Sequence, residues 1–166
     1  MVTTNCLTGK ACYYEEKNNP QRIIDIVRAS SSLPFVCPIA YVDGIPMLDG
    51  GITDSIPLLR AQNEGFTENN VVVLTRNRGY RKQIKGTKVP PFIYRKYPLL
   101  REAINNRSKL YNEQLDLVER LEDEGRITVI RPQRPIEVDR IEKNIDKLTA
   151  LYEEGYQLAD GIRFEL

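Results

Sequence analysis

The chain has 166 residues, of which 41% are hydrophobic and 28% charged, and its net charge is +1. This length suits one domain with a real core, and the near-neutral charge does not draw the chain to nucleic acid or to membranes. The absence of histidine excludes Ser-His-Asp and Cys-His catalysis and histidine metal sites within this chain. Three cysteines without C-x-x-C spacing fit neither a disulfide framework nor a zinc site. We expect reduced thiols, a cytoplasmic location, and no metal or cofactor.

The N-terminal part of the sequence predicts a hairpin and then a helix. Two β-prone segments, residues 2–4 and 11–15, flank a turn at Gly9. Asn19 can cap a helix that starts at Pro20 and ends near Ala29. That helix has three apolar residues on one predicted face: Ile23, Ile24 and Val27. Residues 35–39 are apolar but interrupted by prolines, so we predict an extended buried segment there rather than a central strand.

The middle of the sequence predicts a second hairpin, a helix and a strand. Asp43-Gly44 between two apolar segments is a strong signal for a two-residue hairpin turn. Either Asp54 or Ser55 can cap a helix through Gln62. Residues 71–74 are branched and aliphatic without polar alternation, which is typical of a strand covered on both faces in a parallel sheet.

The C-terminal half predicts two helices around one strand. A helix runs from about Tyr97 to Gly125, with an apolar stripe that comprises Leu110, Leu117, Val118 and Leu121. A buried strand at residues 127–130 follows, and the last helix has an apolar face that comprises Ile141, Ile145, Leu148 and Tyr152. Alternating helices and strands indicate the α/β class. Residues 1–166 are predicted to form a single domain, with a core in residues 1–75 and a basic loop plus C-terminal helices in residues 76–166.

Asp49 is the candidate catalytic residue. It follows the apolar residues 45–48 and precedes Gly50 and Gly51. Asp-Gly is also a common turn former, because the aspartate side chain bonds to the local backbone, and that interpretation needs no catalytic role. A second glycine, however, lets a substrate or another backbone approach closely. A carboxylate partly withdrawn from water also holds a proton more readily, as a general base at neutral pH must.

Residues 28–61 contain three features in order: Ala29-Ser30-Ser31-Ser32-Leu33-Pro34, then Asp49-Gly50-Gly51, then Asp54-Ser55-Ile56-Pro57. Together they resemble the C-terminal half of the patatin-like phospholipases, and the resemblance extends to residues 71–80 and, more loosely, to the C-terminal helices, as in bacterial members. It implies the C-terminal part of a three-layer α/β/α sandwich with a partly parallel sheet. It also implies that Asp49 is the base of a Ser-Asp dyad that cleaves lipid or other carboxylic esters, and that Gly50 and Gly51 shape the turn.

The nucleophile of that dyad is missing from the sequence. The family's serine stands in a G-x-S-x-G elbow, and no serine of this chain has glycine both two residues before and two residues after it. We therefore expect the chain to be inactive alone and to need the N-terminal half of such a domain, in cis or in trans. A fragment is the favoured explanation, and a separate chain that pairs with another is the alternative. An incomplete sheet also predicts a homo-oligomer.

Residues 76–101 form a basic window that contains nine basic residues, no acidic residue and several aromatic residues. Such windows bind anionic lipid headgroups or nucleic acid. The residues selected for headgroup binding are Arg76, Arg78, Arg81 and Lys82. The alternative is a solvated loop that the acidic remainder of the chain balances. For a lipid hydrolase, peripheral contact with a membrane surface suits this window better than nucleic acid, which is not an expected partner. The second functional hypothesis is a non-catalytic module that binds an anionic partner through this window.

Overall fold

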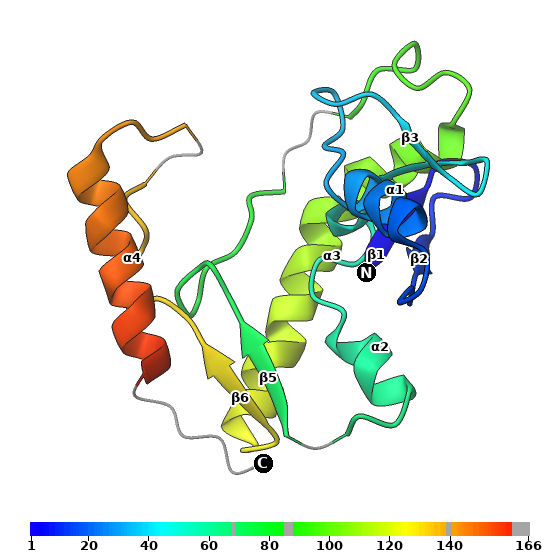
Figure 1. The fold of residues 1–166 in the computed structure, drawn as a ribbon. Helices are drawn as coiled ribbons and strands as arrows, with labels where there is room; N and C mark the ends of the chain where they lie inside the picture. The colour runs from blue at the N-terminus through cyan, green and yellow to red at the C-terminus, as the bar shows by residue number, and fades with distance from the viewer. Residues whose placement is uncertain (68, 85–87, 139–140, 161–166) are drawn as a thin grey trace. The chain divides into compact units, whose positions relative to one another are not determined.

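The computed structural model describes residues 1–67, 69–84, 88–138 and 141–160. The chain divides into two compact units. The first unit comprises Met1–Pro57 and Lys82–Leu115, and the second comprises Leu58–Arg81 and the chain from Asp116 onward. The longest helix is α3 (Pro98–Asp123; Figure 1), and it supplies residues to both units.

The first unit is built on a four-stranded sheet in which all neighbouring strands are antiparallel. Its strands run in the order β2-β1-β4-β3 and comprise β1 (Val2–Asn5), β2 (Ala11–Tyr13), β3 (Ala40–Val42) and β4 (Ile45–Asp49). Both predicted hairpins are confirmed. Asp43 and Gly44, with φ of 52° and 77°, adopt the left-handed backbone that a two-residue hairpin turn requires.

Helix α1 (Pro20–Ser30) packs on this sheet through Ile26 and Ala29, which are fully buried in a cluster with residues of β3 and β4. The helix and its cap are confirmed, since Asn19 Oδ1 accepts a hydrogen bond from the amide of Arg22 at 3.1 Å. The predicted apolar face was wrong at two of its three residues, whereas the third, Ile23, is half-buried. Ile24 and Val27 are exposed, because the side of the helix that contacts the sheet carries Ile26 and Ala29 instead.

A second buried cluster joins Cys6, Leu48, Ile52 and Leu100, so the start of α3 packs on the end of β4 and on the short 3-10 helix η1 (Gly50–Ile52). The prediction of an extended buried segment at residues 35–39 was wrong. Residues 34–36 form a turn, and the side chains of Phe35 and Val36 are exposed. The amide of Cys37 donates to the carbonyl of Leu33 at 2.9 Å, which bends the chain before a strand can form.

The second unit contains α2 (Leu58–Asn63) and two parallel strands, β5 (Asn70–Val73) and β6 (Ile127–Ile130). The parallel pairing is confirmed, but Val71 and Val73 are 42% and 68% exposed in the described structure, so β5 is not covered on both faces. Helix α2 starts later than predicted, because Asp54 and Ser55 direct their side chains to other partners.

The C-terminal part of α3 buries Val118 and Leu121, as its predicted stripe requires. Gly125 ends the helix as predicted, with φ of 67° and hydrogen bonds from its own amide to Glu122 O and from the next amide to Leu121 O.

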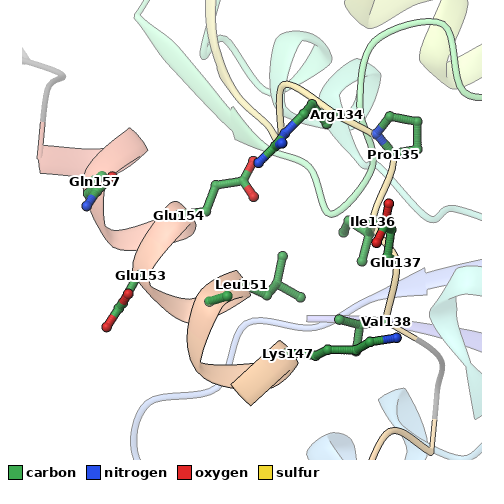
Figure 2. A pocket seen from close by; sticks show the side chains of 11 residues that line it. Arg134, Pro135, Ile136, Glu137, Val138, Lys147, Leu151, Glu153, Glu154 and Gln157 are labelled. Atoms are coloured by element: carbon green, nitrogen blue, oxygen red, sulfur yellow. The ribbon is translucent and has the colours of Figure 1, made fainter. Parts of the chain in front are cut away.

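Helix α4 (Ile145–Asp160) has no buried residue. Its predicted apolar face is exposed, with Ile145 at 75%, Leu148 at 42% and Tyr152 at 70%, and Ile141 precedes the helix. Another side of α4, which includes Leu151 and Glu154, lines a cavity of about 590 Å³ against residues 134–138. Figure 2 shows Arg134 and Glu154 pointing toward each other across this cavity. The α/β class is confirmed; parallel pairing in the described residues is confined to β5 and β6.

Candidate active site

The candidate site is the turn at the end of β4, in the first unit. Asp49 ends the strand, and its side chain caps η1, with Oδ1 accepting a hydrogen bond from the amide of Gly51 at 2.6 Å. The local turn chemistry expected of Asp-Gly is therefore present. The second carboxylate oxygen, Oδ2, makes no hydrogen bond or ion pair with any residue that the structure describes. The side chain is half-buried, so one oxygen is fixed by the backbone while the other is available to a partner.

Gly50 is required by the close approach of β1. A Cβ at this position would lie 2.4 Å from the carbonyl oxygen of Val2 and 2.6 Å from its carbonyl carbon. A Cβ at Gly51 would lie 2.9 Å from Asp49 Oδ1, so a side chain at this position would displace the carboxylate. The two glycines therefore leave room for the turn to close tightly beside Asp49.

The serine-rich segment and β1 fix the backbone of Asp49. The amide of Asp49 donates to the carbonyl of Ser32 at 2.9 Å, and Thr4 Oγ1 donates to the carbonyl of Asp49 at 2.8 Å. Ser32 and Thr4 are both buried. The structure thus brings together the Ala29–Pro34 and Asp49–Gly51 features that were separate in the sequence.

Two side chains of α3 reach the turn and the residues after it. Arg107 Nε donates to the carbonyl of Gly51 at 2.7 Å, and Gln114 Nε2 donates to Asp54 Oδ1 at 2.5 Å. The hydroxyl of Tyr13 donates to the other oxygen of Asp54 at 2.6 Å. Sequence reasoning missed these residues, because a lone arginine, glutamine or tyrosine far away in the chain has no spacing signal that ties it to Asp49.

The serine hydroxyls near the turn donate to backbone carbonyls. Ser32 Oγ donates to Arg28 O at 2.8 Å, and Ser55 Oγ donates to Gly51 O at 2.8 Å. Ser31 Oγ likewise donates to Val27 O at 2.9 Å. These hydroxyls serve as backbone caps, which agrees with their lack of a G-x-S-x-G setting.

The predicted headgroup-binding arginines of the second unit have acidic partners on α3. Arg78 forms ion pairs with Glu122 and Asp123, and Arg81 with Asp116 and Glu119. The hydrogen bond from Arg81 is the main cause that lowers the pKa of Glu119 to about 2. These pairs occupy N–H groups that a phosphate would need.

The other two cations of that set stand over aromatic rings. Arg76 Cζ lies 5.1 Å from the ring centre of Tyr80, and Lys82 Nζ lies 3.6 Å from the ring centre of Tyr111. Headgroup binding by the four residues stays a prediction.

Among the described helices, none combines the length and the apolar character that crossing a bilayer requires.

The turn lies within a segment that a known family shares. Residues 11–61 match the patatin-like phospholipase family. This patatin-like segment includes the serine-rich stretch, Asp49 and both glycines. Residues 97–162, which include α3 and α4, match a second family, described as a domain of unknown function (DUF6363). Residues 71–80 lie in neither match, and their resemblance stays a prediction. The comparison with curated proteins gave no match.

Proposed function

We propose that this chain carries the base of a serine acyl hydrolase that cleaves lipid or other carboxylic esters through a Ser-Asp dyad. The observation that supports this most strongly is the state of Asp49 inside the patatin-like segment. Its carboxylate is half-buried, Oδ1 is fixed by Gly51, and Oδ2 has no partner among the described residues. A general base needs this combination of fixed orientation and an accessible oxygen.

In the proposed reaction, Asp49 Oδ2 accepts the proton of a serine hydroxyl while the serine oxygen attacks the ester carbonyl. The protonated carboxyl then gives that proton to the leaving alcohol, which leaves an acyl-serine. Water attacks the acyl-serine next, with Asp49 accepting its proton and returning it to the serine oxygen, so that the acid is released and the dyad is restored. Asp49 thereby performs the role that histidine has in a triad.

The serine comes from a stretch of polypeptide that this sequence does not contain, since none of its serines stands in a nucleophile elbow. The partner that supplies it is the N-terminal half of a patatin-like domain, in cis or in trans. The three-layer arrangement of the assembled domain belongs to the same proposal.

The anion-binding alternative has less support. The window at residues 76–101 remains basic, but Arg78 and Arg81 are paired with four carboxylates of α3. Each pair lowers the positive potential that would attract a phosphate. Salt-dependent binding of the chain to anionic vesicles, with neutral vesicles as the control, tests this alternative.

The test of the hydrolase proposal uses a short-chain chromogenic ester. The purified chain alone is expected to give no turnover, and turnover is expected when a polypeptide with the serine elbow is added. Asp49→Asn in the assembled protein should lower kcat by about 10²–10⁴-fold, which is the usual contribution of a general base. Asp43→Asn is the matched control, because Asn-Gly keeps the hairpin turn. Full activity of Asp49→Asn, or turnover by the chain alone that survives this change, would contradict the proposal.

A further inference from the structure

The region that matches a domain of unknown function contributes directly to the first unit. Residues 98–115 of α3 belong to this unit together with the Asp49 turn. Leu100 is fully buried against Leu48 and Ile52, on either side of the turn. The start of this region is therefore part of the same core as the patatin-like segment.

Arg107 of α3 donates a hydrogen bond to the carbonyl of Gly51, two residues after Asp49. The amide of Gly51 is held by Asp49 Oδ1, and its carbonyl is held by Arg107 Nε at 2.7 Å, with Ser55 Oγ as a second donor. Gly51 is thus held at both its amide and its carbonyl. A hydrogen bond from a guanidinium is charge-assisted and stronger than one from a neutral hydroxyl.

The guanidinium stands beside the carboxylate without neutralising it. A Cβ on Gly51 would be 2.9 Å from Asp49 Oδ1 and 3.5 Å from Arg107 Nη2, so both groups face the same side of Gly51. Among the ion pairs between described residues, none joins Arg107 to Asp49. Arg107 therefore acts on the backbone that orients the carboxylate and leaves Oδ2 unpaired.

We propose that Arg107 is a positioning residue for Asp49. Residues 98–115 of α3, which carry Arg107, therefore help to hold the proposed base in its orientation. The expected effect of Arg107 on catalysis rests on the proposed function, in which Asp49 is the base. The structural part of it, that Arg107 holds the turn closed, does not depend on any activity.

Amide hydrogen exchange of the full chain tests the structural part. The reporters are the amides of Gly51, Thr53 and Asp54, since the first bonds to Asp49 and the other two bond to Gly50 O. Arg107→Met should speed their exchange by about tenfold or more, because a hydrogen bond to a charged group is lost. The exchange rates of these amides in Arg107→Lys should fall between those in Arg107→Met and those in the unmodified chain, since lysine keeps a cationic donor.

Lys109→Met is the matched control, because it removes a cation from the same helix at a side chain that is 70% exposed. It should leave the three reporters unchanged. Equal exchange in Arg107→Met and Lys109→Met would overturn the proposal. Faster exchange that extends equally to the amides of α1 would also overturn it, since Arg107 would then support the whole unit rather than the turn.

Ester hydrolysis by the assembled protein supplies the second readout. Arg107→Met should lower kcat with little change in KM, and Arg107→Lys should restore part of kcat, because a misoriented base slows the chemical step without weakening substrate binding. A rise in KM alone would overturn the positioning role. If the reporters loosen in Arg107→Met while Asp49→Asn keeps full activity, the proposed function fails and the structural inference stands.

Discussion

Replacing Gly50 with alanine is the sharpest test of the turn's geometry. The new Cβ would lie 2.4 Å from Val2 O, whereas ordinary van der Waals spacing is roughly 3.5 Å, so β1 and the turn would have to separate by about 1 Å. That movement is resisted because β1 pairs with β2 on one side and with β4 on the other. We expect a loss of about 1–3 kcal/mol in the free energy of unfolding, as for other overpacked sites.

For a chain of this size, this loss should lower Tm by about 3–10 °C in thermal unfolding followed by far-ultraviolet circular dichroism. Gly155→Ala is the control, since a Cβ there meets nothing within 4 Å and alanine favours the interior of α4. Its Tm should stay the same or rise slightly. A Gly50→Ala chain that melts within about 1 °C of the unmodified chain would refute the argument that β1 imposes glycine at this position.

Further predictions concern the second unit and the cores. The hydrogen bond from Arg81 is the main cause that lowers the pKa of Glu119 from its usual 4.5 to about 2, so the contribution of Glu119 to stability is present above pH 4.5 and is lost as the pH falls toward 2. In thermal melts across that range, the Tm of Glu119→Gln should depend less on pH than the Tm of the unmodified chain. An identical pH dependence in the two chains would contradict the pairing. Burial raises the pKa of the Cys6 thiol to about 12, so iodoacetamide at pH 8 should modify Cys37 before Cys6, as mass spectrometry can establish; rapid modification of Cys6 in the folded chain would show that its site is open. Leu100→Ala should lower the free energy of unfolding by about 2–5 kcal/mol, because the Leu100 side chain is fully buried. Tyr152→Ser should change the free energy of unfolding by less than about 0.5 kcal/mol, because Tyr152 is 70% exposed. A large effect of Tyr152→Ser in denaturant unfolding would mean that α4 is covered in solution.

Local signals in the sequence predicted the elements that local chemistry determines. Asn19 with Pro20 begins α1, and Asp43-Gly44 makes a hairpin, because in each case a short stretch of residues fixes its own backbone. Gly125 ends α3 for the same reason. The Asp49 turn was predictable on the same grounds, since one carboxylate and two glycines in succession determine its shape.

Features that depend on contacts distant in sequence were not predictable. The buried face of α1 was assigned to the wrong residues, because Ile24 and Val27 are as apolar as Ile26 and only the position of the sheet distinguishes them. The amphipathic pattern of α4 indicated burial, yet its apolar face is exposed in the described structure. Arg107 could not be assigned to the site, because an arginine on a helix is normally solvated and no local pattern links it to Gly51.

The most direct test of the central claim is the rate at which an organophosphonate ester labels the nucleophilic serine of the assembled protein. Labelling requires removal of the serine proton, so it reports on the base without a contribution from hydrolysis of the acyl-serine or from product release. We predict that Asp49→Asn slows labelling by about a hundredfold or more while Tm stays close to that of the unmodified protein. Labelling at an unchanged rate in Asp49→Asn would contradict the assignment of Asp49 as the base.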